Sequence, residues 1–253
     1  TSLSGLTVSK LSLREAAIEM ISRVALEQAR HHRASFLVFD YLTEQEAESH
    51  RWPSDFVTTQ IADPGTRLDI LWSDFDDYVA HLSKSARKDF RRHRNRAADM
   101  GVEIAFHSLV ESMGENTIDQ SLTLIRNVDR HHCSAPHPYG RALLENAHMV
   151  DATWLTATVT DRVVGCGLML GDGGVRFLAL LGLDYETKYA YFQMLYASIH
   201  SAIENGVEVL RGGSGAYDLK RRLGFQVEDN DHVTFAGNGA VFRRLGCWAA
   251  RMV

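Results

Sequence analysis

Three apolar segments joined by short polar turns constrain the fold of this chain more than any other feature. The segments are residues 153–159, 163–170 and 175–183, and the turns between them are residues 160–162 and 171–174. Turns of three or four residues rich in Gly and Asp connect neighbouring antiparallel strands. The pattern therefore predicts a three-stranded antiparallel meander.

A helix and further elements surround this meander. Apolar residues recur at helical spacing from Ala190 to Asn205, and Gly206 ends the segment. The remaining expected elements from residue 101 onward are strands at 102–107, 207–210, 225–227 and 233–236, and helices at 117–133, 139–149, 216–223 and from 241. The fold class is therefore α/β (α+β), with a mixed, mostly antiparallel sheet and flanking helices.

The first hundred residues give a shorter series of expected helices and strands. It contains a helix at 14–31, a strand at 35–42, a short helix at 43–50, and strands at 55–61 and 67–72. Pro64-Gly65 between the last two strands predicts a hairpin. Residues 74–82 begin a helical stretch, and Ser83 can cap a second helix that ends near Gly101.

The second of these helices carries a concentrated positive charge. The chain has a formal net charge of −5, yet seven basic residues and one acid lie between Ser83 and Arg96. Lys84, Lys88 and Arg91 lie opposite an apolar stripe, which consists of Val79, Leu82, Ala86, Phe90, His93, Ala97 and Met100. Two interpretations carry equal weight: a solvated helix face, or a phosphate contact to the acceptor arm of a tRNA, a nucleotide-linked substrate or a carrier-protein arm.

Composition excludes several other classes. No apolar run is long enough to span a membrane, and no signal peptide opens the chain, which begins at Thr1. Three distant cysteines without a CxxC motif, and twelve histidines without an HExxH motif, favour neither disulfides nor a metal site. We therefore expect a cytoplasmic protein with no metal or required cofactor. The sequence does not indicate an oligomeric state.

Three local motifs resemble one family of transferases. They are Ser83-Lys-Ser-Ala-Arg-Lys-Asp-Phe-Arg-Arg92, the helix from Tyr191 to Gly206, and Gly213-Ser-Gly-Ala-Tyr-Asp-Leu-Lys220 followed by Leu-Gly-Phe225. Their order and spacing resemble the Fem-type aminoacyltransferases and the related BioF2-like group of the GNAT superfamily. The resemblance implies a partial GNAT-like unit at 1–73, basic connecting helices at 74–100 and a GNAT-type transferase domain at 101–253. Fem-type proteins usually contain a complete first unit, so either upstream residues were removed or this member is compact.

The resemblance also implies a site, with two departures from acetyl-CoA enzymes. Those enzymes hold the CoA pyrophosphate with a glycine-containing loop, but residues 184–191 contain no glycine. Lys220 stands where a proton-donating tyrosine is usual, and a lysine there suits stabilisation of a phosphate or an oxyanion. The expected catalytic residues are Lys220 and Tyr217, the donor- and acceptor-binding residues are Asp184, Tyr191, Gln193, Arg211, Gly212, Gly213, Ser214 and Gly215, and the phosphate- or RNA-binding residues are Lys84, Arg87, Lys88 and Arg91.

Each of these residues also has a structural interpretation. Lys220 could be a surface lysine on a short helix, and Tyr217 could be a packing residue. Tyr191 and Gln193 could pack at the start of a helix, while Asp184 could cap it.

The resulting functional hypothesis is an acyltransferase that forms an amide on an amine acceptor, with aminoacyl-tRNA as the donor. The acceptor is expected to be an amine-bearing peptide, a nucleotide-linked molecule or a small molecule. The absent glycine loop, Lys220 and the basic helix favour this donor. One alternative is an acyltransferase dependent on acyl-CoA or an acyl carrier. A second is a catalytically silent GNAT-like module that binds a cell-wall precursor or a polysaccharide.

Overall fold

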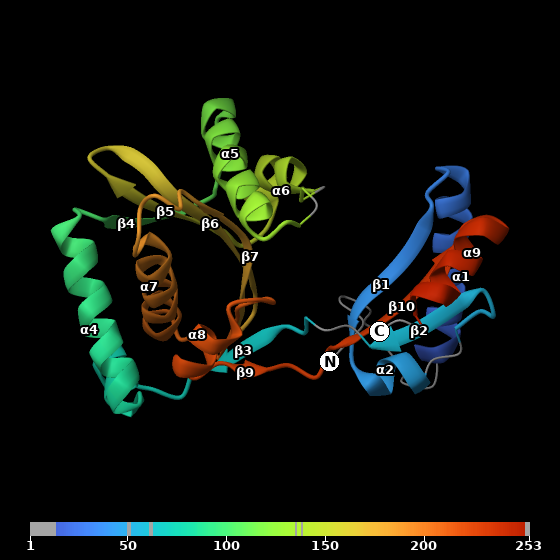
Figure 1. Ribbon diagram of the computed structural model, residues 1–253, viewed down its shortest axis with the longest axis horizontal. Helices are drawn as coiled ribbons and strands as arrows, with labels where there is room; N and C mark the ends of the chain where they lie inside the picture. Colours follow the sequence, from blue (N-terminus) through green and yellow to red (C-terminus); the bar gives the residue numbers. More distant parts are fainter. Residues whose placement is uncertain (1–13, 50–51, 61–62, 135, 138, 251–253) are drawn as a thin grey trace. The chain divides into compact units, whose positions relative to one another are not determined.

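The computed structural model describes residues 14–49, 52–60, 63–134, 136–137 and 139–250 (Figure 1). The chain forms two compact units. The larger unit consists of residues 66–226, and the smaller one combines residues 1–65 with 227–253. The domain division expected from the sequence has other boundaries, and as a statement about evolutionary domains it stays a prediction.

A seven-stranded sheet forms the centre of the larger unit. Its order is β4 (Glu103–Ser108), β5 (Ala152–Val159), β6 (Arg162–Asp172), β7 (Val175–Leu183), β8 (Val209–Arg211), β3 (Thr66–Asp69) and β9 (Gln226–Val227). Strands β4 to β7 pair antiparallel, as does β8 with β3, while β7 and β8 are parallel. The expected meander is therefore confirmed.

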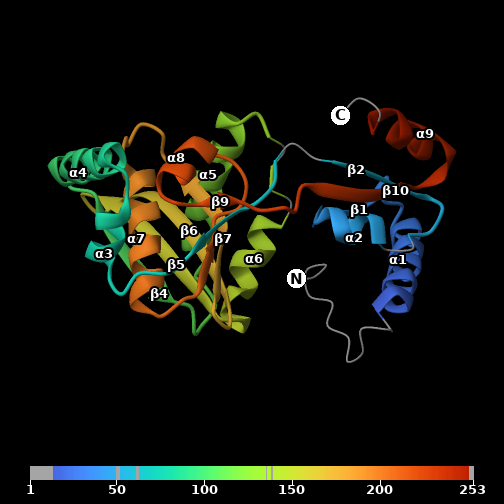
Figure 2. The same ribbon diagram turned by 90° about the horizontal axis from the view of Figure 1, so that it is seen from below.

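Helices cover both faces of this sheet (Figures 1 and 2). The helices are α3 (Phe75–His81), α4 (Lys84–Asp99), α5 (Glu115–His131), α6 (Gly140–Asn146), α7 (Ala190–Glu204) and α8 (Tyr217–Arg222), and a 3-10 turn, η2, spans Ala147–Met149. Helices α5 and α6 lie on one face, and α7 lies on the other with α4 beside it. Close approach of α5 requires Gly182, because a Cβ there would lie 2.8 Å from the amide nitrogen of Ile125.

The apolar stripe predicted along α3 and α4 is largely confirmed. Leu82, Ala86, Phe90, His93 and Ala97 are buried. The stripe ends before Met100, which is 38% exposed at the C-cap of α4. Asp74 and Ser83 cap α3 and α4 by accepting hydrogen bonds from the amides of Asp77 and Ala86.

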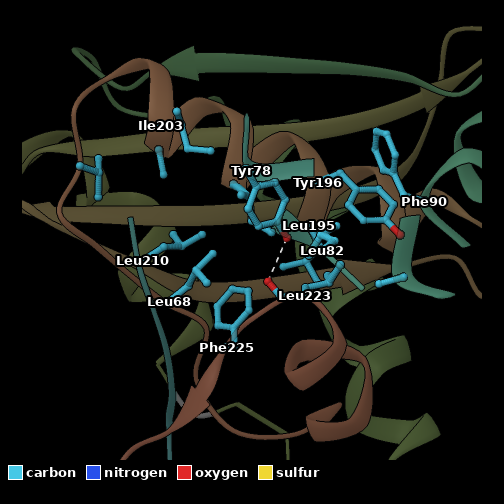
Figure 3. Packing of buried hydrophobic residues seen from close by; sticks show 14 of the residues in the cluster. Leu68, Tyr78, Leu82, Phe90, Leu195, Tyr196, Ile203, Leu210, Leu223 and Phe225 are labelled. Atoms are coloured by element: carbon cyan, nitrogen blue, oxygen red, sulfur yellow. Dashed lines mark hydrogen bonds between the residues drawn. The ribbon is translucent and has the colours of Figure 1, made fainter. Parts of the chain in front are cut away.

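Around this stripe lies the main core of the larger unit (Figure 3). It joins α3, α4 and α7 to the β8–β3 side of the sheet through Tyr78, Tyr196, Ile199, Leu210 and Phe225. Tyr78 is completely buried, and its hydroxyl donates to the carbonyl of Leu223 at 2.9 Å. Helix α3 is thereby fastened to the C-terminal end of α8.

The smaller unit contains a three-stranded sheet built from distant parts of the chain. Its elements are α1 (Arg14–His31), β1 (Phe36–Leu42), α2 (Glu44–Ser49), β2 (Phe56–Gln60), β10 (His232–Gly237) and α9 (Gly239–Ala249). Strand β10 is central and pairs antiparallel with both β1 and β2.

Two expectations are corrected by this sheet. The hairpin around Pro64-Gly65 is wrong, because β2 pairs with β10 while β3 pairs with β8 in the other sheet. The strand expected at 233–236 does not complete the sheet of the larger unit, because it supplies the centre of the smaller one. The expected fold class is nevertheless confirmed, since both sheets are mostly antiparallel and carry flanking helices.

Candidate functional site

The parallel strands β7 and β8 separate after a short stretch of pairing. Val175, Arg176 and Phe177 pair with Val209, Leu210 and Arg211, after which β8 ends. Strand β7 continues to Leu183. A register shift between Leu168 and Met169, where β6 meets β7, adds an irregularity opposite this divergence. Beyond Phe177 the edge of β7 that faces β8 therefore has no strand partner among the described residues, and we call this unpaired edge the opening.

Lys220 of α8 organises the loop that follows β8. Its side chain is only 4% exposed. The Nζ atom donates to three consecutive backbone carbonyls, those of Gly212, Gly213 and Ser214, at 2.8, 3.1 and 3.1 Å. Burial lowers the pKa of Lys220 from 10.5 to about 8, so the ammonium form still predominates at neutral pH. The side chain is thus neither a surface lysine nor directed toward solvent.

The backbone of this loop is unusual and tightly held. Gly213, Gly215 and Ala216 all have positive φ angles, of 65°, 79° and 49°. Thr66 of β3 holds the loop from the other side, because its carbonyl accepts from the amide of Gly212 at 2.7 Å and its hydroxyl donates to the carbonyl of Gly213 at 2.7 Å. Sequence reasoning missed Thr66, since a threonine at the start of a strand carries no recognisable signal.

Gly212 has no room for a side chain. A Cβ atom would lie 3.0 Å from both the Phe225 ring and Thr66 Oγ1, and 3.4 Å from Lys220 Cε. The glycines of the motif therefore place the backbone against Lys220, as expected, but with the carbonyls facing the ammonium.

Two further predicted residues flank this loop. Arg211 is the last residue of β8 and lies opposite Phe177 of β7 and Arg67 of β3 in the strand pairings. Tyr217 begins α8, three residues before Lys220. The structure thus brings Lys220, Tyr217 and residues 211–215 into one segment beside the opening, while their chemical roles stay predictions.

Asp184 lies at the other end of the opening. It follows β7, seven residues beyond Phe177, which is roughly 23 Å along an extended strand. One carboxylate oxygen accepts from the amide of Glu186 at 3.0 Å, and the other lies 2.9 Å from the guanidinium of Arg162. The side chain shapes the loop before α7 and does not cap the helix, whose N-cap is Tyr189.

Tyr191 and Gln193 belong to the first turn of α7. Tyr191 packs against two apolar clusters, and burial raises the pKa of its hydroxyl to about 12. The Nε2 atom of Gln193 is buried and has no hydrogen-bond partner within the described part of the chain. Among the described residues, no hydrogen bond joins Asp184, Tyr191 or Gln193 to Lys220, so the predicted site falls into two separate groups.

The basic residues of α4 form a surface together with α8. Lys84, Lys88 and Arg91 are exposed, whereas Arg87 donates to the carbonyls of Ala80 and Leu82 at 2.7 and 2.6 Å and braces the junction of α3 and α4.

The link between the two helices is Asp89. Its carboxylate pairs with Arg92 of α4 at 2.8 Å and with Arg222 of α8. Both arginine side chains remain at least half exposed. Sequence reasoning missed Arg222, although the run Lys220-Arg-Arg222 signalled a second source of positive charge.

The described residues were also searched for a metal-binding cluster and for a membrane-spanning helix. No group of three or more His, Cys, Asp or Glu side chains lies close enough together to hold a metal ion. None of the described helices is both long and apolar enough to cross a bilayer.

The splayed parallel pair, the antiparallel meander and the helix packed across it define a GNAT-type fold. Proteins of low identity share this fold. FemX matches with a TM-score of 0.54 and 10% identity, covering 92% of this chain and 86% of FemX. L-PGS from Bacillus licheniformis matches with a TM-score of 0.55 and 11% identity, covering 94% and 79% of the two chains. A conserved protein of unknown function from Bacteroides thetaiotaomicron gives 0.53 and 13%, covering 87% and 76%.

A family assignment follows from residues 5–239, which match the FemAB-like family, described as peptidoglycan biosynthesis/recognition. This protein belongs to that family, a group of Fem-like, GNAT-fold transferases related to peptidoglycan. No curated protein sequence matches the chain significantly.

Proposed function

We propose that this protein transfers an aminoacyl group from aminoacyl-tRNA to an amine on a peptide or nucleotide-linked cell-wall precursor. The observation that carries the proposal is the opening beside β7, bordered at one end by the Lys220-held loop of residues 212–216. An extended acyl donor can lie along the backbone of β7 there, with its ester carbonyl near the loop. The family assignment supports a peptidoglycan-related acceptor.

The reaction requires little covalent chemistry from the protein. The acceptor amine attacks the ester carbonyl, a C–N bond forms, the ester C–O bond breaks, and the tRNA hydroxyl leaves with the proton that the amine loses. Catalysis then rests on positioning the two substrates and on donors for the oxyanion that develops on the carbonyl oxygen. A proton route through Tyr217 is part of the proposal.

The basic surface of α4 and α8 supports RNA over a small donor. Lys88 and Arg91 are exposed on α4, and Arg222, two residues after Lys220 on α8, adds a half-exposed basic side chain that pairs with Asp89. Phosphodiester backbones are bound by such arrays of Lys and Arg, with little dependence on base sequence. An acyl-CoA donor carries its phosphate groups on a single nucleotide and would need only a compact phosphate site.

A transfer assay tests the proposal. Radiolabelled aminoacyl-tRNA and an amine-bearing muropeptide are incubated with the protein, and labelled amide product is separated by chromatography. We expect product that disappears after RNase treatment of the donor and that is strongly reduced by Lys220→Ala. Activity that survives RNase when acyl-CoA is supplied would assign the donor to acyl-CoA. Precursor binding without turnover by any donor would identify a silent binding module.

A further inference from the structure

The seven-stranded sheet has two very different edge strands. On one side β9 contains only Gln226 and Val227, so it provides almost no backbone for pairing. On the other side β4 runs from Glu103 to Ser108 and pairs with β5 in an unbroken register. Edge strands that are protected against association are usually short, bulged, or marked by lysine or proline. Strand β4, with the sequence Glu-Ile-Ala-Phe-His-Ser, has none of these features.

The outer edge of β4 is accessible to another strand. Within the described part of the chain, the backbone of residues 103–108 makes no hydrogen bond outside its ladder with β5. Every side chain of the strand is exposed except that of Ile104, which is half-buried. Even the large apolar residue Phe106 is 38% exposed. A row of unpaired N–H and C=O groups beside exposed apolar side chains is a template for strand addition.

The side chains of β4 divide between the two faces of the sheet. Ile104 and Phe106 pair with residues of β5 that pack against α7, so these two side chains lie on the face that α7 covers. Glu103, Ala105 and His107 therefore lie on the opposite face. An acid and a histidine thus lie on one face, two residues either side of Ala105, and two apolar residues lie on the other.

This order of residues is complementary to itself. A two-fold axis perpendicular to the sheet makes two copies of β4 antiparallel and keeps both faces continuous. Because directly paired residues must then share a face, one residue pairs with its own counterpart at the axis. When that residue is Ala105, Glu103 of one copy lies opposite His107 of its partner, and Ile104 lies opposite the partner's Phe106.

Neighbouring registers lose these matches. With Ile104 or Phe106 at the axis, Glu103 no longer lies opposite His107. The Ala105 register also places the smallest side chain of the strand where the two copies meet. Within one copy, Nε2 of His107 lies 3.3 Å from the hydroxyl of Thr156, which leaves Nδ1 to donate to the carboxylate of the partner's Glu103.

We propose that two copies of this chain associate through β4, as antiparallel strands with Ala105 at the two-fold axis. The seven-stranded sheets of the two copies then form one continuous sheet. Because the axis is perpendicular to that sheet, both α7 helices, each with α4 beside it, lie on the same face (Figures 1 and 2). The inference goes beyond the proposed function and does not depend on the transfer reaction.

Sedimentation equilibrium of the intact protein over a concentration series tests the association. A single strand pair is smaller than a standard interface of ~1,600 Å², so we expect a reversible dimer with a micromolar dissociation constant. A protein that stays monomeric up to near-millimolar concentration would overturn the proposal.

Charge variants test the pairing of the acid with the histidine. His107→Glu places a second carboxylate opposite Glu103 at both ends of the strand pair and should weaken the dimer by about tenfold. Adding Glu103→His to His107→Glu restores both matched pairs and should return the dissociation constant to within about threefold of wild type. The control Glu27→His changes an exposed acid of α1 and should have no effect. A dimer that His107→Glu leaves unchanged would place the interface elsewhere and refute the proposal.

Oxidative cross-linking tests the register independently. Opposed residues of antiparallel strands have Cα atoms about 4.5–5.5 Å apart, a distance that a disulfide can span. In a background with Cys133→Ser and Cys247→Ser, which removes the exposed thiols among the described residues, Ala105→Cys should give a covalent dimer under mild oxidation.

The matched control for the cross-link is Ser108→Cys. In the proposed register the two copies of position 108 lie about 20 Å apart along the strands, so this variant should stay monomeric on a non-reducing gel. Cross-linking of Ser108→Cys as efficient as that of Ala105→Cys would refute the register. Circular dichroism shows whether each variant is folded, and the cross-link decides the question if His107→Glu is not.

Discussion

Replacing Tyr78 by phenylalanine should weaken the larger unit by a measurable amount. The Tyr78 hydroxyl is completely buried and donates to the carbonyl of Leu223 at 2.9 Å (Figure 3). Removing the hydroxyl loses one hydrogen bond and leaves a buried carbonyl without this donor, which costs about 1–2 kcal/mol. For a unit of this size, we expect the midpoint of thermal unfolding to fall by about 3–6 °C. Urea denaturation followed by fluorescence should show the same loss of free energy.

A matched control identifies the cause. Tyr139→Phe removes a hydroxyl from a side chain that is 68% exposed and should change the free energy of unfolding by less than about 0.5 kcal/mol. The reasoning would be refuted if Tyr78→Phe were as stable as wild type, or if both variants lost the same amount. Because Leu223 ends α8, Tyr78→Phe should also raise the exchange rate of the α8 amides in hydrogen-exchange experiments.

Four further predictions follow from the same contacts. Burial lowers the pKa of Lys220 from 10.5 to about 8, so the unfolded chain binds more protons than the folded chain between these pH values. The free energy of unfolding should therefore rise from about pH 8 to pH 10.5, by at most ~3 kcal/mol. In urea denaturation at a series of pH values, Lys220→Met should remove this rise, and a wild-type protein without the rise would contradict the prediction. Burial lowers the pKa of His93 below 6.5, so stability should be lost as the pH falls below about 6.5, and His93→Gln should reduce that loss in the same assay. Gly212→Ala should destabilise the protein by about 1–3 kcal/mol in thermal unfolding, since its Cβ has no space; an unchanged midpoint would show that the loop adapts. Lys88→Gln should weaken tRNA binding in filter assays and lower the salt dependence of log K by about one if it contacts one phosphate, while Lys188→Gln should not.

Local elements could be predicted from the sequence because their signals are local. The helix expected at 190–205 is α7 at 190–204, and the strand expected at 175–183 is β7 with the same limits. The apolar residues and the flanking glycines that indicate these elements lie within a few residues of one another. The pairing of β2 could not be inferred in this way. Its partner β10 lies far along the chain, as the bond between Thr58 and Thr234 illustrates, and Pro64-Gly65 was a misleading local signal.

The placement of Lys220 beside the glycines of its motif was predictable, whereas the directions of the peptide groups were not. The motif indicated that Lys220 lies beside Gly212 and Gly213, which is what the structure has. It did not indicate which way the peptide groups face, because that depends on Thr66 and on the positive φ angles of a loop. The separation of Asp184 from Lys220 likewise depends on where β8 ends.

The position of β10 has a consequence for biosynthesis. Residues 66–226 form a continuous unit, so that unit can fold while the chain is still being synthesised. The sheet of the smaller unit cannot, because its central strand is β10, and β1 and β2 meet only through it. Until residues 232–237 leave the ribosome, strands β1 and β2, which carry apolar and aromatic side chains, have unpaired edges. A nascent chain paused before residue 232 should therefore be the form that chaperones bind most strongly.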